Sequence, residues 1–285
     1  MYQILSKRAL NEHVTMMEVE APLIAKKALP GQFIIFRVDE LGERVPLTVA
    51  ATDPERGAVT IIFQAVGHAT KKLQQLEVGD QILDFVGPLG RPSDLDDARR
   101  AVVIGGGVGN AIAYPSARYL HERGAVVDVI AGFRSRDLVI LEEEFRAAST
   151  RLFITTDDGS YGEAGFVTDK LRALLDAGNQ YDLAIAIGPV PMMKFVSKLT
   201  LEYGLRTLVS LNPIMVDGTG MCGGCRVLVG GQTRFACVDG PEFDGHQVDF
   251  DDLMLRNRSY REQELEDHSC RLEQAAQKVE AQHAP

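Results

Sequence analysis

The stretch Ala101-Val-Val-Ile-Gly-Gly-Gly-Val-Gly109 joins a short apolar run to four glycines. The apolar run predicts a buried strand, and the residues after the glycines predict a helix. Glycines at such a junction let backbone amides approach a pyrophosphate at the helix N-terminus. The candidate nucleotide-binding residues are therefore Gly105, Gly106, Gly107 and Gly109. The same pattern is also typical of a tight βα turn that binds nothing.

Strands and helices alternate downstream of this stretch. Strands are expected at 101–104, 126–131, 152–155, 183–187 and 207–210, and helices up to residue 123 and at 141–148, 167–177 and 192–203. Such alternation predicts a parallel sheet with helices on both faces. We therefore expect an α/β nucleotide-binding domain over residues 98–210.

The segment upstream has a different rhythm. Short apolar or alternating runs at 16–19, 32–38, 45–50, 59–64 and 81–85 are separated by Gly, Pro and Asp clusters. Short strands at even spacing predict a small closed β-barrel, here over residues 1–97. One short helix is expected at 70–76.

Three of the four cysteines lie within sixteen residues of one another, at Cys222, Cys225 and Cys237. Gly230-Gly231 between two alternating runs predicts a hairpin, which pairs Cys225 with Ala236 and returns Cys237 to its neighbourhood. We expect a separate cysteine unit over 211–250, followed by a helical extension over 251–285.

Three thiolates need a fourth ligand, and Asp217 stands five residues before Cys222, where a C-x4-C-x2-C pattern would have a cysteine. We predict a [2Fe–2S] cluster held by Asp217, Cys222, Cys225 and Cys237. The alternatives are that Asp217 is only a turn residue before Gly218, or that the site holds a structural zinc ion. The uneven spacing favours the iron–sulfur cluster.

Composition limits the partners of the chain. The net charge of −10 over 285 residues argues against nucleic acid and anionic membranes. No apolar run is long enough to cross a bilayer, and the N-terminus has no signal-peptide pattern. We expect a cytoplasmic protein, in which clustered cysteines indicate metal or redox chemistry. Cys270 stands alone in the charged tail.

The order of barrel, nucleotide domain and cysteine unit resembles the ferredoxin–NADP reductase superfamily. Within it, the chain is similar to electron-transfer subunits of dihydroorotate dehydrogenase B, and more so to small subunits of NADH-dependent reduced ferredoxin:NADP oxidoreductases. The most specific motifs run from Ser210 to Cys225 and from Phe235 to Phe243. The fold class this implies is a β-barrel flavin domain, an α/β parallel-sheet domain and a small C-terminal iron–sulfur unit.

The resemblance implies FAD. The flavin motif of the superfamily matches Arg44-Val-Pro-Leu-Thr48, in which Arg44 would face the pyrophosphate and Thr48 the isoalloxazine, while Pro46 and Leu47 lie between them. A second flavin segment matches Gly67 to Thr70, which would offer amides and a hydroxyl to the phosphates. Without the resemblance, Arg44 and Thr48 would be interpreted as an exposed strand pair.

The resemblance also implies where the nicotinamide nucleotide binds. Gly188-Pro189 matches a loop near the nicotinamide, while Asn110 to Ala113 replaces the apolar residue and proline usual after the glycine loop. Asp157 and Asp158 would favour a ribose 2′-hydroxyl and hence NAD(H). Two arginines, at 134 and 136, are the alternative, since they suit a 2′-phosphate. Hydride transfer between cofactors needs no general base, so no catalytic side chain is assigned.

These features predict an oxidoreductase subunit that moves electrons between NAD(H), FAD and a [2Fe–2S] cluster. A one-electron carrier needs a docking partner, and the resemblance implies a larger flavin and iron–sulfur subunit in a hetero-oligomer, with ferredoxin reached through that partner. We expect the C-terminal extension to clasp the partner. The alternatives are the electron-transfer subunit of dihydroorotate dehydrogenase B and a zinc-stapled regulatory protein that senses nucleotide without redox turnover.

Overall fold

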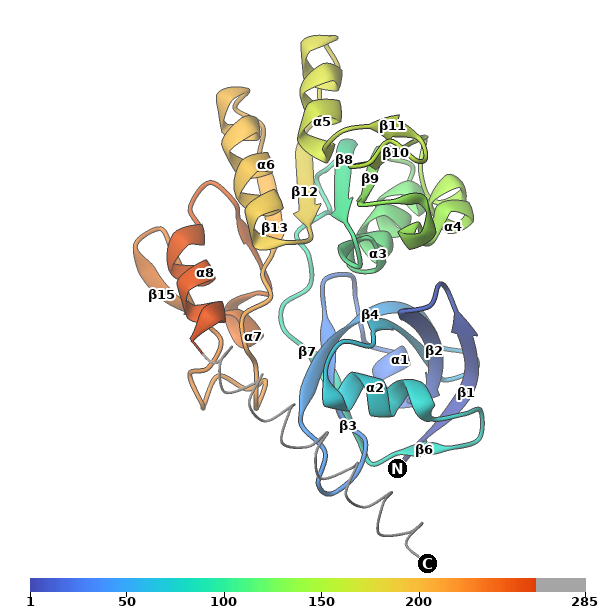
Figure 1. Cartoon of the computed structure of the whole chain (residues 1–285). Coiled ribbons are helices and arrows are strands. Elements are labelled where there is room, and N and C mark those ends of the chain that lie inside the picture. Colours follow the sequence, from blue (N-terminus) through green and yellow to red (C-terminus); the bar gives the residue numbers. More distant parts are fainter. Residues whose placement is uncertain (260–285) are drawn as a thin grey trace, which may run out of the picture.

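The computed structural model describes residues 1–259 and contains two seven-stranded sheets and a two-stranded hairpin (Figure 1). The first sheet lies at the N-terminal end of the chain, and the second carries helices on both faces. No helix within residues 1–259 is both long and apolar enough to span a bilayer.

The first sheet is antiparallel and nearly closed into a barrel. Its strand order is β6-β1-β2-β5-β4-β3-β7, and the single residue Leu83 joins the two edge strands. Phe36, Phe63 and Phe85 fill the interior, where apolar side chains of alternate strand positions meet. The elements are β1 (Tyr2–Ala9), β2 (Val14–Glu20), α1 (Pro22–Ala25), β3 (Phe33–Arg37), β4 (Val45–Asp53), β5 (Ala58–Gln64), α2 (His68–Gln75), β6 (Gln81–Ile82) and β7 (Asp84–Leu89).

The second sheet is parallel except at one edge, with the order β11-β10-β9-β8-β12-β13-β16. Strand β8 lies in the middle: the chain first runs outward to one side, through β9, β10 and β11, and then returns to β12 and β13 on the other. The elements are β8 (Arg100–Gly106), α3 (Gly109–Glu122), β9 (Val126–Phe133), η1 (Arg136–Leu138), α4 (Glu142–Ala147), β10 (Arg151–Thr156), β11 (Glu163–Ala164), α5 (Val167–Asp176), β12 (Leu183–Ile187), α6 (Val190–Glu202) and β13 (Thr207–Ser210).

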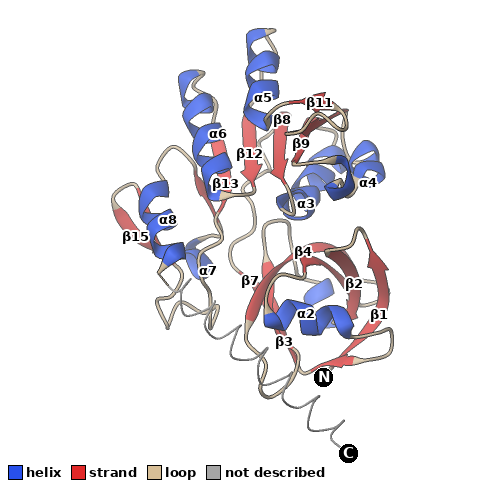
Figure 2. Cartoon of the chain, in the orientation of Figure 1, coloured by secondary structure: helices blue, strands red, loops and turns tan. Residues whose placement is uncertain are grey.

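Helices cover both faces of this sheet (Figure 2). Apolar residues of α3 and α4 belong to one buried cluster with inward residues of β8 and β9, and those of α5 and α6 belong to another. The strands are buried on both faces of the sheet, which explains why their sequences are continuous apolar runs. The predicted barrel and α/β sheet are confirmed.

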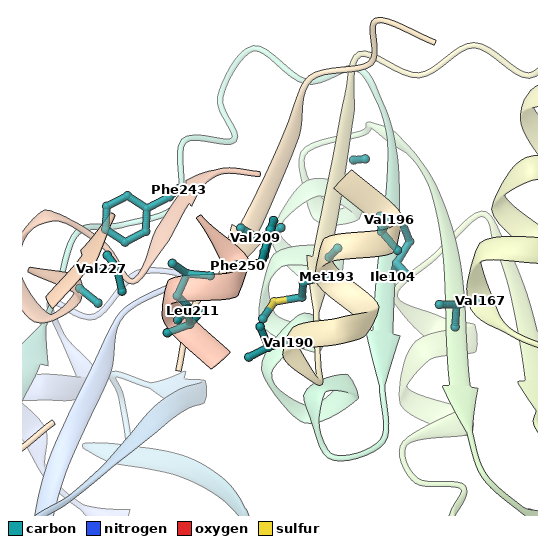
Figure 3. Packing of buried hydrophobic residues seen from close by; sticks show 14 of the residues in the cluster. Ile104, Val167, Val190, Met193, Val196, Val209, Leu211, Val227, Phe243 and Phe250 are labelled. Carbon is teal, nitrogen blue, oxygen red and sulfur yellow. The ribbon is translucent and has the colours of Figure 1, made fainter. Parts of the chain in front are cut away.

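The cysteine unit packs against the nucleotide-domain sheet. It contains β14 (Arg226–Val229), β15 (Gln232–Phe235), α7 (Ala236–Asp239) and β16 (Glu242–Asp244), and helix α8 (Phe250–Arg258) follows it. One apolar cluster runs from the sheet past Met193 of α6 to Leu211, Val227 and Phe243 of this unit (Figure 3). Because β16 pairs with β13, the second sheet crosses the boundary that we predicted at residue 210.

The eight-residue strand β1 was not predicted, nor were short elements such as α1 and β11. The division of the chain into domains at 1–97, 98–210, 211–250 and 251–285 stays a prediction. Of the expected C-terminal helix, the structure describes α8; the rest of the extension and Cys270 lie outside the described residues.

A carboxyl group lies where the barrel, the linker and β16 meet. A Cβ atom on Gly31 would lie 3.3 Å from Oε1 of Glu242 and 2.2 Å from Oγ of Ser93. Within residues 1–259, Oε2 of Glu242 and Oγ of Ser93 are buried without a hydrogen-bond partner. Burial raises the pKa of Glu242 to about 7, so the group gains or loses a proton near neutral pH.

We predict that Glu242→Gln stabilises the protein at pH 8 and has less effect at pH 5. The folded chain holds the Glu242 proton up to about pH 7 and the unfolded chain only up to 4.5, so wild-type stability falls as the pH rises between these values. The loss is at most about 3 kcal/mol. Urea unfolding at both pH values measures it, with the exposed Glu163→Gln as control. An identical difference between wild type and Glu242→Gln at pH 5 and pH 8 would refute it.

Candidate functional site

The four predicted metal ligands form two close pairs. The Sγ atoms of Cys225 and Cys237 lie 3.2 Å apart, and Sγ of Cys222 lies 3.4 Å from Oδ1 of Asp217. The Gly230-Gly231 hairpin produces the first pair, because Ala236 N donates to Cys225 O across the end of the ladder. The register predicted for this hairpin is therefore confirmed.

Asp217 is held by the loop that follows it. Its carboxylate accepts hydrogen bonds from the amides of Thr219, Met221 and Cys222 at 3.0–3.1 Å, and from the Thr219 hydroxyl at 3.2 Å. These bonds, led by the Thr219 amide, hold the pKa of Asp217 down at about 2. The side chain is an anion at neutral pH, with one oxygen facing a cysteine.

The two pairs differ in exposure. Cys225 and Cys237 are buried, whereas Cys222 and its neighbour Met221 lie at the surface, Met221 with 87% of its area exposed. Burial, followed by the neighbouring Cys225, raises the pKa of Cys237 to about 12. Such a thiol is protonated at neutral pH, and a metal ion that binds its sulfur would displace the proton to solvent.

Within residues 1–259, no three His, Cys, Asp or Glu side chains are arranged around a single point as they would be for one metal ion.

The loop that carries Asp217 packs directly on the barrel. Gly218 has φ +77°, and a Cβ atom there would lie 2.6 Å from Cδ1 of Ile35 and 2.8 Å from Cδ1 of Leu89. Only glycine adopts this conformation easily and leaves room for the two side chains. Ile35 pairs across β3 and β4 with Pro46, which belongs to the predicted flavin motif. We name residues 216–222 the metal-ligand loop, after the ligands predicted in it. This loop and the predicted flavin motif therefore contact the same strand, β3.

The flavin motif lies on and just before β4. Arg44, Pro46, Leu47 and Thr48 are all half-buried, and Thr48 pairs with Phe33. Arg44 donates from Nε to the carbonyl of Val216 at 3.0 Å, one residue before Asp217. The two remaining nitrogens of a guanidinium point away from Nε, so this bond leaves a fork for an anion.

The second flavin segment differs from expectation in one respect. The Thr70 hydroxyl is engaged within the chain: it accepts from the amides of Val66 and Gly67 and donates to the carbonyl of Gly67. A buried hydroxyl at a helix start satisfies backbone groups that the helix leaves unpaired. What this segment offers to a phosphate is the first amides of α2 and the open space at Gly67, where a Cβ atom would have no neighbour within 4 Å. His68 is exposed at the start of this helix.

The glycine loop lies where the strand order of the second sheet reverses, between β8 and β12. Ile187 pairs with Gly105, so Gly188 and Pro189 emerge beside the loop. A Cβ atom on Gly109 would lie 2.4 Å from the carbonyl oxygen of Ile187. Open α/β sheets bind ligands at such reversal points, outside the carboxyl ends of the strands.

Three of the loop glycines are required by close packing, and the fourth is required by its conformation. Cβ atoms on Gly105 and Gly106 would lie 2.0 Å from Oδ1 of Asn110 and 2.4 Å from Sδ of Met192, and Gly109 is equally tight. Gly107 has φ +57° and open space around it. The loop therefore presents its backbone at Gly107 toward solvent.

Asn110 is a residue of this site that the sequence did not reveal as useful. It is fully buried, and its Nδ2 donates to the carbonyls of Gly107 and Gly132 at 2.9 and 3.3 Å. These two acceptors fix the orientation of the amide. The side chain ties the glycine loop to the end of β9. The sequence did contain one indication of this role, because Asn110 is polar at a position where the superfamily usually has an apolar residue.

Asp157, Asp158, Arg134 and Arg136 lie together after β9 and β10. The amides of Asp157 and Asp158 donate to the carbonyls of Phe133 and Arg134. Ser160 donates from its hydroxyl and its amide to Asp158, which lowers the pKa of that carboxyl group. Both acids and both arginines are exposed, with Arg136 stacked on the Tyr161 ring at 5.5 Å. Carboxylates and arginines thus face the same edge of the sheet.

Comparisons with known proteins agree with this geometry. The model for the iron–sulfur cluster binding domain of dihydroorotate dehydrogenase B matches residues 212–249. An uncharacterized protein of Clostridium beijerinckii is 53% identical over 272 residues, covering 93% of this chain and 92% of its own length. A homolog of the dihydroorotate dehydrogenase B (NAD(+)) electron transfer subunit from Thermotoga maritima is 47% identical, with 92% of each chain covered. The corresponding subunit of Shouchella clausii is 38% identical and covers 81% of this chain and 90% of its own.

Two solved structures extend the comparison. A chain of the NADH-dependent reduced ferredoxin–NADP oxidoreductase, described in a study of flavin-based electron bifurcation, superposes with a TM-score of 0.89. It is 44% identical, with 95% of this chain and 98% of that chain covered. A ferredoxin reductase of carbazole 1,9a-dioxygenase, 22% identical, covers 72% of this chain and 65% of its own with a TM-score of 0.59, and shows the shared fold alone.

A flavin-type barrel, a nucleotide sheet and an iron–sulfur binding domain define a ferredoxin reductase-like oxidoreductase subunit that uses FAD, an iron–sulfur cluster and NAD(H). More narrowly, the chain belongs to the family of dihydroorotate dehydrogenase B electron-transfer subunits and their homologues.

Proposed function

We propose that the chain carries electrons between NAD(H), FAD and a [2Fe–2S] cluster, and exchanges them with a larger flavin and iron–sulfur subunit. The observation that carries this proposal is the packing of Gly218 on Ile35, the partner of Pro46 across β3 and β4. It places the metal-ligand loop against the strand next to the flavin motif. Electron transfer requires such closeness between the two sites.

The cluster ligands are Asp217, Cys222, Cys225 and Cys237. A [2Fe–2S] cluster takes two protein ligands on each iron, and the chain supplies one carboxylate–thiol pair and one thiol–thiol pair. A single zinc ion would need four donors around one point. The donor arrangement therefore supports the two-iron cluster, and the surface position of Cys222 supports electron exchange with a docked protein.

The flavin is bound by Arg44, Pro46, Leu47 and Thr48 along β4, with its phosphates near Gly67 and the start of α2 that holds Thr70. The nucleotide pyrophosphate meets the loop from Gly105 to Gly109, with Gly188 and Pro189 beside the nicotinamide. When bound, FAD accepts electrons in pairs from the nucleotide and passes them on singly. The side chains orient the cofactors, and none of them serves as a general acid or base.

The partner docks over the exposed side of the metal-ligand loop, in the cytoplasm. Ile214, Val216, Met221 and Val238 expose apolar area there, and Leu255 of α8 is 70% exposed. Apolar side chains gathered at a redox centre suit a protein interface. The similarity to the NADH-dependent reduced ferredoxin–NADP oxidoreductase supports a partner of that kind, with ferredoxin reached through it and electron bifurcation as the activity of the complex.

We predict that each of Cys222→Ala, Cys225→Ala and Cys237→Ala loses iron and keeps FAD. Asp217→Cys should retain a cluster with an altered spectrum and potential, because a thiolate replaces a carboxylate. Iron content, absorbance and EPR measure these outcomes. Asp249→Ala is the matched control, since Asp249 also accepts backbone amides, at the start of α8. A cluster of unchanged spectrum, potential and stability in Asp217→Ala would show that Asp217 is not a ligand.

We predict that NADH reduces the flavin more efficiently than NADPH, by about tenfold or more, because Asp157 and Asp158 repel a 2′-phosphate. Anaerobic stopped-flow reduction with each nucleotide measures the preference. Asp158→Asn should reduce the preference for NADH. Asp176→Asn, at the end of helix α5 and not after the carboxyl end of a strand, should leave the preference unchanged. Faster flavin reduction and tighter binding with NADPH than with NADH would instead indicate that Arg134 and Arg136 bind the 2′-phosphate.

We predict that the native protein purifies as a hetero-oligomer with the larger subunit. Met221→Asp should weaken that complex without loss of FAD, because it places a charge in the apolar interface. Native pull-down with the wild-type and variant chains measures this, with Leu41→Asp on the barrel as an equally exposed control. Full physiological turnover by the isolated chain would contradict the subunit proposal.

A further inference from the structure

Arg44 contacts a segment that is 172 residues away in the sequence. Its Nε atom donates to the carbonyl oxygen of Val216 at 3.0 Å, and Val216 immediately precedes Asp217. The backbone two residues after Val216 is also restrained, because Gly218 packs closely against the side chains of Ile35 and Leu89. The hydrogen bond and this packing together fix the position from which the Asp217 side chain projects.

The guanidinium group is shaped to serve two sites at once. It is planar, and its donors point in fixed directions, so a bond from Nε to one acceptor leaves the two terminal nitrogens for another. The terminal nitrogens suit the bidentate recognition of a phosphate group. Arg44 is half-buried just before β4, between the barrel strand of the flavin motif and the metal-ligand loop.

We propose that Arg44 is a positioning residue for the metal-ligand loop as well as a flavin contact, so that FAD binding and the order of residues 216–222 are coupled. The inference rests on the proposed function, which places the flavin pyrophosphate at Arg44. A bound pyrophosphate fixes the plane of the guanidinium, and the fixed guanidinium holds the Val216 carbonyl. Loss of FAD frees Arg44 to rotate, and the loop then loses one charge-assisted hydrogen bond.

Arg44→Lys separates the two roles. Lysine keeps the positive charge but has no rigid fork, so a single ammonium group serves the phosphate or the carbonyl and not both in fixed geometry. The matched control is Arg37→Lys. Arg37 ends the neighbouring strand β3 and also donates through Nε, but to Asp84 within the barrel at 2.6 Å.

The coupling is tested by hydrogen–deuterium exchange of the cluster-loaded chain, with FAD removed and then restored. In wild type and in Arg37→Lys, FAD should slow amide exchange in residues 216–222 by about tenfold or more, the effect of one charge-assisted hydrogen bond. In Arg44→Lys at saturating FAD the slowing should be lost, and EPR of the reduced cluster should broaden. Arg44→Ala should behave likewise if it folds.

The outcomes separate this inference from the proposed function. Equal slowing by FAD in wild type and Arg44→Lys, or no slowing in wild type, would overturn the coupling even where FAD still binds. FAD affinity, measured separately by fluorescence, tests the flavin role of Arg44. Unchanged affinity in Arg44→Ala would show that the pyrophosphate does not bind at Arg44. Slowing in wild type that disappears only in the Arg44 variants supports the coupling.

Discussion

The close contact of Gly218 with Ile35 and Leu89 is the constraint on which the rest of the site depends. A side chain at residue 218 would collide with both, and the positive φ excludes most other residues. The contact seats the metal-ligand loop on β3, one strand from the flavin motif. It makes neighbours of two predicted sites whose residues Arg44 and Val216 lie 172 positions apart in the sequence. It also leaves Cys222 and Met221 exposed, on the side where we propose that the partner docks.

The strand order of the second sheet positions the predicted nucleotide-binding residues. The second sheet reverses its strand order beside β8, so Gly105 to Gly109 and Gly188-Pro189 meet at one point. Close packing at Gly105, Gly106 and Gly109 leaves no room for side chains at this junction. Asn110 adds side-chain hydrogen bonds to the carbonyl groups of Gly107 and Gly132, which already accept backbone amides, and so ties the loop to the end of β9. The pyrophosphate binding that we propose here rests on the backbone at a helix N-terminus and requires no catalytic side chain.

The sequence predicted what depends on local pattern. Alternating runs predicted the barrel strands other than β1, and βα alternation predicted the parallel sheet. Gly230-Gly231 predicted the register that brings Cys237 back to Cys225. It did not predict contacts between distant segments: Arg44 with Val216, or β16 joining β13 across the expected boundary. It also misjudged the Thr70 hydroxyl, because a side chain that suits a phosphate equally suits the start of its own helix.

The proposed cluster lies against β3, one strand from the flavin motif, and NMR of the FAD-loaded protein measures this proximity. Unpaired electrons of a reduced cluster broaden the resonances of nearby nuclei. We expect the amide signals of Ile35 and Leu47 to broaden when the cluster is reduced, while that of Val19, on strand β2 of the same barrel, stays sharp. Sharp signals from Ile35 and Leu47 in the reduced protein would contradict it.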